Sequence, residues 1–300
     1  MSIDSKLALV IDNLGIGDQI CLIPSLKKLK ERFGQFDILS SDPSYNDPKL
    51  RFFSESEYVR KYRHIKDNEL LQIKRNDIIL YDEIRHLSHP GIWEMLNKSE
   101  HLSIRYLKQL NLEYNDDTPE KEIEINLPKD RVDEYAYFND YYLIAPCHIK
   151  PNWGKWFDLS IYSELVKRFS KNIKFITLYN LPLPYETETF WTDDFDQLQM
   201  FLKSVRGVVT IDSCIQHYCN ALRKKALVLW GYGESRVKKF GYKSHINIFN
   251  KESDLYDDLP NDTHQLPQWV DHYIRKDIDY KIFFESFEEL IEETKCKETK

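Results

Sequence analysis

The sequence predicts an α/β protein of two doubly wound domains, each built on a parallel sheet, facing each other across a cleft. Three observations predict this class. Short apolar runs alternate with helical stretches over residues 7–112, and the alternation resumes over residues 142–249. Between the two series, residues 115–133 are charged and contain two prolines, which is typical of a linker. Because strands that alternate with helices form parallel sheets, we expect an N-terminal domain at 1–133 and a C-terminal domain at 134–300.

The N-terminal domain begins with the apolar run Leu7–Asp12, which predicts a buried strand. The turn Gly15-Ile16-Gly17-Asp18 follows, and then a helix to about Arg32 with an apolar face at helical spacing. The basic run 60–66 is interpreted as a solvated helix face or a loop. Further elements are predicted at 36–39 and 77–81 (strands) and at 91–112 (a helix).

The C-terminal domain repeats the pattern. Strands are predicted at 142–145, 173–179, 207–211, 226–230 and 246–249. Helices are predicted at 159–169, 194–205, 214–222, 268–274 and 282–294. We expect the last helix, at 280–295, to pack back toward the N-terminal domain.

Composition narrows the class of protein. The formal net charge of −7 argues against a dedicated nucleic-acid binder, although a local basic groove stays open. The five cysteines show no C-x-x-C spacing, which is typical of reduced thiols. There is no signal-peptide pattern and no apolar run of membrane-spanning length. We therefore expect a cytoplasmic protein without a transmembrane segment, with a peripheral position at the inner membrane as an alternative.

The stretch 207–231 organises the C-terminal domain as strand, polar turn, helix and strand. Asp212 and Ser213 follow the first strand, and His217 lies one helical turn further on. A helix that begins at the carboxyl end of a parallel strand directs unpaired N–H groups at a ligand, which suits phosphate. Asp212 either orients ligand hydroxyls or caps its helix. His217 either donates to a phosphate or sugar, or is structural.

Three stretches together resemble glycosyltransferase family 9, whose best-known members are bacterial ADP-heptose:lipopolysaccharide heptosyltransferases. Residues 13–33 resemble the family's opening Gly-x-Gly-Asp loop and Leu-Lys-rich helix, and residues 155–165 resemble its Lys, Trp and following helix. Residues 212–217, followed by a strand that ends at Gly231, resemble its Asp-Ser/Thr-Gly-x-x-His pattern. Cys214 stands where the family usually has glycine. Abundant Lys, Asn, Asp and Tyr with only nine Gly resembles phage-encoded relatives, for which the location would be the host cytoplasm.

The resemblance implies a GT-B fold and an inverting transfer that needs no metal or other cofactor. It implies that the C-terminal domain binds a nucleotide-sugar donor and that the N-terminal domain holds the acceptor. The implied loop residues are Gly15 and Gly17. The implied donor-binding residues are Lys155, Asp212, Ser213, Cys214, His217 and Gly231.

Inverting transfer needs a base for the acceptor hydroxyl and positive charge or N–H donors for the departing diphosphate. Asp18 is the candidate base, because it follows a Gly-rich turn after the first strand; its alternative role is to cap the helix after it. Asp12 is the second candidate base. Lys155 is the candidate phosphate contact, with Lys150 as the weaker alternative.

Competing chemistries fit less well. The turn at Gly15 and Gly17 is half of a dinucleotide fingerprint, but Ile20 replaces its third glycine. Neither Cys147-His148 nor the Cys214, His217 and Cys219 group has standard zinc-ligand spacing. The triplet 194–196, Asp-Phe-Asp, is interpreted as the start of a helix rather than as a metal site.

The acceptor stays open between two classes. The resemblance implies a lipopolysaccharide or other surface glycan, and the phage-like composition leaves a modified base in DNA as the alternative. The second class of function is a non-catalytic nucleotide-sugar-binding protein, which Cys214 keeps in consideration.

Overall fold

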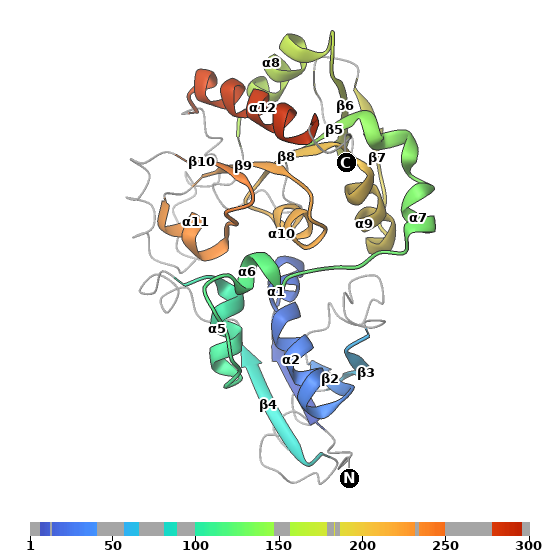
Figure 1. Ribbon diagram of the computed structural model, residues 1–300, viewed down its shortest axis with the longest axis vertical. Helices are drawn as coiled ribbons and strands as arrows, with labels where there is room; N and C mark the ends of the chain where they lie inside the picture. Colours follow the sequence, from blue (N-terminus) through green and yellow to red (C-terminus); the bar gives the residue numbers. More distant parts are fainter. Residues whose placement is uncertain are drawn as a thin grey trace. The chain divides into compact units, whose positions relative to one another are not determined.

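A computed structural model describes residues 7–12, 14–40, 57–65, 81–88, 100–146, 157–178, 183, 187–231, 234–249 and 278–295 (Figure 1). The chain divides into two compact units. The first comprises Met1–Gly91 with Leu102–Ile123, and the second comprises Ile92–His101 with Glu124–Lys300. The change of unit after Ile123 comes earlier than the expected boundary after residue 133.

The first unit contains a parallel sheet with the strand order β3-β2-β1-β4. Its strands are β1 (Leu7–Asp12), β2 (Phe36–Ser40), β3 (Val59–His64) and β4 (Glu83–Ser88). Its helices are α1 (Ile16–Cys21), α2 (Ile23–Phe33), α5 (Leu102–Gln109) and α6 (Thr118–Lys121). The predicted strands at 7–12 and 36–39 are confirmed, whereas the strand predicted at 77–81 lies, apart from Tyr81, outside the described residues.

The basic run at 60–66 corrects the sequence interpretation, because most of it forms the edge strand β3 rather than a helix or loop. A buried acid explains how so charged a segment joins the sheet. The Asp37 carboxylate, on β2, is 3% exposed and accepts hydrogen bonds from Arg60 Nε (2.8 Å) and Tyr81 Oη (2.9 Å). A buried carboxylate needs such partners, so the arginine is retained at the strand edge by its ion pair.

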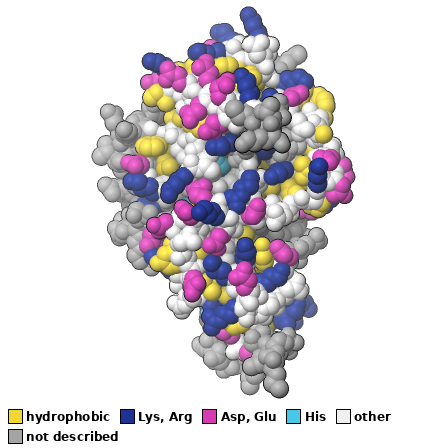
Figure 2. Space-filling model, viewed as in Figure 1, with side chains coloured by type: hydrophobic (Ala, Val, Ile, Leu, Met, Phe, Trp, Pro, Cys, Tyr) yellow, Lys and Arg dark blue, Asp and Glu magenta, His cyan; other side chains and the backbone are white. Residues whose placement is uncertain are grey.

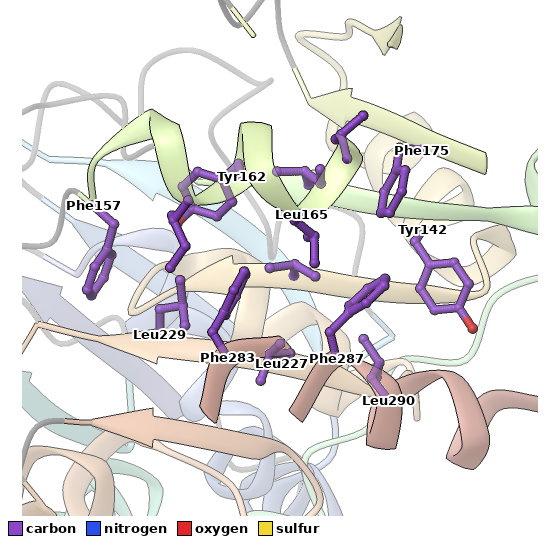
Figure 3. Close-up of a cluster of buried hydrophobic side chains, with 14 of the residues drawn as sticks. Tyr142, Phe157, Tyr162, Leu165, Phe175, Leu227, Leu229, Phe283, Phe287 and Leu290 are labelled. Atoms are coloured by element: carbon purple, nitrogen blue, oxygen red, sulfur yellow. The ribbon is translucent and has the colours of Figure 1, made fainter. Parts of the chain in front are cut away.

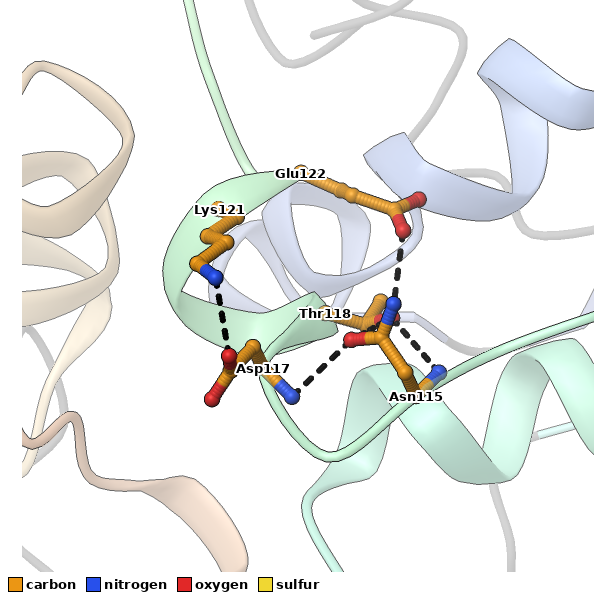
Figure 4. A network of polar contacts seen from close by, with 5 residues as sticks. All are labelled: Asn115, Asp117, Thr118, Lys121 and Glu122. Carbon is orange, nitrogen blue, oxygen red and sulfur yellow. Dashed lines mark hydrogen bonds and ion pairs between the residues drawn. The ribbon is translucent and has the colours of Figure 1, made fainter.

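The expected linker contains an ordered turn instead of an irregular segment (Figure 4). Thr118 Oγ1 accepts from the Asn115 backbone N–H at 3.1 Å and donates to Glu122 Oε1 at 3.2 Å. Asn115 Oδ1 accepts from the Asp117 N–H at 3.0 Å, and Lys121 pairs with Asp117 at 2.8 Å. These local bonds fix the turn that leads into the one-turn helix α6, which belongs to the first unit.

The second unit contains a six-stranded parallel sheet with the order β10-β9-β8-β5-β6-β7. Its strands are β5 (Tyr141–Ala145), β6 (Lys174–Leu178), β7 (Glu188–Phe190), β8 (Gly207–Ile211), β9 (Ala226–Trp230) and β10 (Ile246–Phe249). Its helices are α7 (Lys129–Asp133), α8 (Leu159–Phe169), α9 (Phe195–Ser204), α10 (Cys214–Ala221), α11 (Glu234–Phe240) and α12 (Tyr280–Lys295), with a 3₁₀ turn at Ala136–Asp140.

Helices cover both faces of this sheet, as expected for a doubly wound domain. Helices α8 and α12 lie on one face, and α9, α10 and α11 lie on the other (Figure 1). Numbered along the chain, the six strands run 3-2-1-4-5-6 across the sheet, and the order reverses between β5 and β8. That reversal is the topological switch point, where ligands bind in folds of this kind.

The C-terminal helix contributes to the core of the second unit. The apolar face of α12 packs on β8, β9 and β10 and contributes four buried side chains to the core of the second unit, Phe283, Phe287, Leu290 and Ile291 (Figure 3). The Phe287 ring lies 5.0–5.8 Å from the rings of Tyr142, Phe169 and Phe175. The apolar face is therefore buried within its own unit.

Several elements were not predicted. They include the strands β4 and β7 and the helices α6, α7 and α11, which have no clear apolar period. The helix predicted at 268–274 lies outside the described residues. Among the helices that the structure describes, none has the length and apolar character needed to cross a membrane.

Candidate active site

The switch point of the second unit lies where β5 and β8 end. Thr210, on β8, donates from Oγ1 to the Ala145 carbonyl of β5 at 3.0 Å. Its hydroxyl also lies 3.4 Å from Ser213 Oγ. A fully buried threonine therefore ties the two strand ends to the turn that follows β8. This places the start of α10 at the edge of the sheet where ligands are expected.

Ser213, rather than Asp212, caps α10. Ser213 has extended backbone angles and its Oγ accepts from the Ile215 N–H at 3.3 Å, as an N-cap hydroxyl does. Asp212 Oδ1 instead accepts from Gln216 Nε2 at 3.1 Å. Ser213 therefore has the capping role that was one alternative for Asp212. The side-chain amide of Gln216 orients the Asp212 carboxylate instead. Both Asp212 and Ser213 are buried.

Cys214 is the first residue of α10 and is partly exposed. The described non-glycine residues with positive φ are Asn111 and Arg223, so the backbone at Cys214 is in a region that any residue adopts. The chain conformation therefore does not require glycine at this position. What the cysteine changes is the volume of side chain at the helix N-terminus.

His217 lies within α10 and is 6% exposed. Its Nδ1 is 2.7 Å from the Tyr242 hydroxyl. The rings of His101 and His245 lie 5.1 and 5.5 Å from the Tyr242 ring. Burial, with a smaller contribution from proximity to His217, lowers the pKa of His101 to about 3 and of His245 to about 4. Both flanking histidines are therefore neutral at ordinary pH.

Gly231 directly follows β9 and is buried. Because β9 is the parallel neighbour of β8, Gly231 lies at the same sheet edge as Ser213. Lys155 and Lys150 lie outside the described residues, as do Cys147 and His148. No group of three His, Cys, Asp or Glu side chains suited to a metal occurs among the residues that were described.

The first unit has its own switch point between β1 and β4, and the loop after β1 lies there. Gly15 is the N-cap of α1, and its N–H donates to Asp18 Oδ2 at 2.9 Å. The helix begins at Ile16, so Asp18 belongs to the first turn rather than preceding the helix as the capping alternative assumed. Its carboxylate nonetheless satisfies an N-terminal N–H, so part of that alternative holds.

The residues on either side of Asp18 pack closely around its carboxylate and the turn. A Cβ added at Gly15 would lie 3.1 Å from Asp18 Oδ2, so the glycine gives the carboxylate room. Gln19, 2% exposed, donates from Nε2 to the Leu14 carbonyl at 3.1 Å. Gly17 lies within the same first turn of α1. Asp12 is the last residue of β1, and its side chain is not among those described.

The sequence did not indicate Thr210, Gln216 or Tyr242 as parts of the site. The spacing of Gln216, four residues after Asp212, is the one local signal that was available, because such residues are neighbours on a helix. Tyr242 comes from the segment after α11, and nothing in its sequence surroundings connects it to His217.

Comparison with known structures shows which proteins have this architecture. A family 9 glycosyltransferase from Veillonella parvula superposes with a TM-score of 0.65 at 13% identity, covering 98% of this chain and 99% of that one. The present chain therefore has the fold of glycosyltransferase family 9. Escherichia coli ADP-heptose lps heptosyltransferase II gives a TM-score of 0.58 at 14% identity, covering 97% and 99% of the two chains.

A third structure of this fold carries a ligand. E. coli heptosyltransferase WaaC with ADP-2-deoxy-2-fluoro heptose gives a TM-score of 0.55 at 14% identity, covering 82% of this chain and 94% of WaaC. No protein-family model and no curated protein sequence matches the chain. The family 9 fold is thus established by structure, at identities too low to carry activity across.

Proposed function

We propose that the protein is an inverting, metal-independent glycosyltransferase that moves a sugar from a nucleotide-diphosphate sugar to an acceptor hydroxyl. One observation carries the proposal. Each unit has a strand-to-helix turn at the switch point of its parallel sheet, and these turns hold the residues expected from the sequence. Asp18 lies at one turn, and Asp212, Ser213 and His217 lie at or just after the other. The proposal includes two domains facing across a cleft, with the acceptor on the first and the donor on the second.

In the proposed reaction, Asp18 takes the proton of the acceptor hydroxyl while the hydroxyl oxygen attacks the anomeric carbon of the donor sugar. The bond from that carbon to the diphosphate oxygen breaks, and the diphosphate leaves with the electron pair. The N-terminus of α10 and its Ser213 hydroxyl stabilise the charge that develops on the diphosphate, and Lys155 adds a cation. Asp212 and His217 hold the sugar or phosphate oxygens. No step requires a metal or another cofactor.

Calorimetry with a panel of nucleotide sugars tests the proposal, followed by measurement of donor hydrolysis for those that bind. We expect at least one donor to bind in the micromolar range and to be hydrolysed slowly without acceptor. If none of the panel binds, the proposal is wrong. Tight binding with no hydrolysis and no transfer to any acceptor would instead support a non-catalytic nucleotide-sugar-binding protein, the alternative that Cys214 at the start of α10 keeps in consideration.

We propose a lipopolysaccharide or other surface glycan as the acceptor. The edge strand β3 exposes Lys61 and Arg63, which favours an acceptor that carries phosphate and keeps a modified base in DNA as the alternative. Figure 2 shows Lys and Arg side chains interspersed with Asp and Glu over the face in view, unlike the single-sign surface of a dedicated DNA binder. DNA binding that weakens steeply with salt would favour the alternative, because phosphate contacts release counterions.

A further inference from the structure

The segment Gly241–Asn247, here called the brace, contacts α10 along one side of the helix. The Tyr242 hydroxyl lies 2.7 Å from His217 Nδ1. Ser244 Oγ donates to Asn220 Oδ1 at 3.2 Å, and His245 Nε2 donates to the Gln216 carbonyl at 3.1 Å. The three contacted residues fall on adjacent turns of one helix face. The brace therefore fixes the rotation of α10 as well as the ring of His217.

The brace is itself anchored to the sheet. Asn247 is part of β10, and its Nδ2 donates to the carbonyls of Tyr242 (2.9 Å) and His245 (3.1 Å). Its Oδ1 accepts from Trp230 Nε1, on β9, at 2.8 Å. At the other end, a Cβ on Gly241 would lie 2.6 Å from the Val237 carbonyl, so the chain leaves α11 without room for a larger residue. Tyr242 is thus held from both sides.

The direction of the bond between Tyr242 and His217 follows from the chemistry of its two groups. A phenol is a better donor than acceptor because its oxygen lone pair is delocalised into the ring, and the unprotonated nitrogen of imidazole is a good acceptor. The neighbouring His101 and His245 rings are neutral, so neither brings a positive charge to Tyr242. The arrangement favours O–H to Nδ1 donation.

We infer that Tyr242 is a positioning residue that holds His217 in the neutral tautomer with its proton on Nε2. The tautomer is set by the bond that the other ring nitrogen makes. Nε2–H is then a hydrogen-bond donor to a phosphate or sugar oxygen. The identity of that ligand rests on the proposed function, whereas the tautomer does not.

Nitrogen-15 NMR of the full chain, labelled at histidine, tests the inference without any donor. The His217 signals are assigned by their loss in His217→Asn. In the unmodified protein we expect Nδ1 to resonate as an unprotonated nitrogen and Nε2 as a protonated one. In Tyr242→Phe we expect a mixture of tautomers. Tyr142→Phe is the matched control, because it removes a buried hydroxyl bonded to Thr294 at 2.6 Å and leaves His217 untouched.

A proton on Nδ1 in the unmodified protein would overturn the inference, as would an unchanged tautomer in Tyr242→Phe. A second measurement uses whichever nucleotide sugar the calorimetric panel identifies. We expect Tyr242→Phe to raise its dissociation constant about five- to tenfold, as for loss of one hydrogen bond, and Tyr142→Phe to leave it unchanged. If no nucleotide sugar binds, the proposed function fails while the tautomer experiment still decides the role of Tyr242.

Discussion

The two switch points occupy the same topological place in their sheets, but they are constructed differently. In the first unit the Asp18 turn is held by contacts close in sequence, from the Gly15 N–H and from Gln19 to the Leu14 carbonyl. In the second unit local contacts of Ser213 and Asp212 are joined by distant partners. Thr210 reaches the Ala145 carbonyl, 65 residues away in sequence, and His217 meets Tyr242, 25 residues away.

This difference suits the two proposed tasks. A base that accepts a proton from an acceptor needs access to solvent-side substrates, and Asp18 is only partly buried. Groups that hold a diphosphate sugar act best when their orientation is fixed before binding, since ordering them on binding costs free energy. Asp212, Ser213 and His217 are all buried and hydrogen-bonded. The following predictions test this contrast between a local, accessible turn and a braced, buried one.

The largest effect is expected for Asp18→Asn. Loss of the base should lower transfer about 100- to 10,000-fold, because the amide cannot take the proton, while the fold is retained. Turnover and thermal unfolding measure the two quantities. Asp116→Asn, at an exposed position of the same unit, is the control and should transfer normally. Transfer by Asp18→Asn at the unmodified rate would remove Asp18 from the mechanism.

The next largest effect concerns the two buried histidines beside Tyr242, which should make the free energy of unfolding depend on pH. His101 and His245 have folded pKa values of about 3 and about 4, below their ordinary value of 6.5. Between pH 6.5 and 4 the unfolded chain takes up protons that the native chain does not, so the free energy of unfolding falls as pH falls. The two residues together should lower it by about 4 kcal/mol between pH 7 and pH 5.

Denaturant unfolding of the protein and of His245→Gln over this pH range measures the contribution. The variant should lose about half of the histidine contribution to the slope of unfolding free energy against pH, because one of the two histidines is gone. The carboxylates that also titrate contribute equally in both proteins. Equal slopes would show that His245 takes up its proton in the native state as readily as in the unfolded one.

A smaller effect is expected for Ser213→Ala. Loss of the N-cap hydroxyl should destabilise the second unit by about 1 kcal/mol, because the Ile215 N–H loses its acceptor. It should also weaken donor binding, which calorimetry measures. A variant whose stability is unchanged would mean that water replaces the hydroxyl at this helix end.

The smallest effect is expected for Gly15→Ala. The φ of Gly15 is −63°, which alanine adopts, so backbone strain does not arise. The added Cβ would lie 3.1 Å from Asp18 Oδ2 and should displace the carboxylate slightly. We expect the free energy of unfolding to change by less than about 1 kcal/mol and the rate of sugar transfer to fall by a larger factor. Equal and minor changes in both would indicate that the placement of Asp18 tolerates movement.

The contrast between the turns also explains what could be predicted from the sequence. The strands of the second sheet other than β7, and the helix α8, follow from apolar patterning, and both turns follow from polar residues placed after a strand. The edge strand β3 was not predicted, because its sequence is charged and the partner of its first arginine, Asp37, lies 23 residues away in sequence. The bracing by Tyr242, Thr210 and Asn247 depends on which strands become neighbours, and periodicity carries no information about strand order.

Helix α12 has a consequence for how the two units form during synthesis. The first unit is complete in sequence once residue 123 has left the ribosome, whereas the second keeps the part of its sheet that α12 covers exposed until the aromatic side of α12 emerges. Nascent chains released before Phe283 should therefore expose that part of the sheet to chaperones and proteases, and those released after Ile291 should not. Proteolysis of chains stalled at these two lengths would reveal the difference.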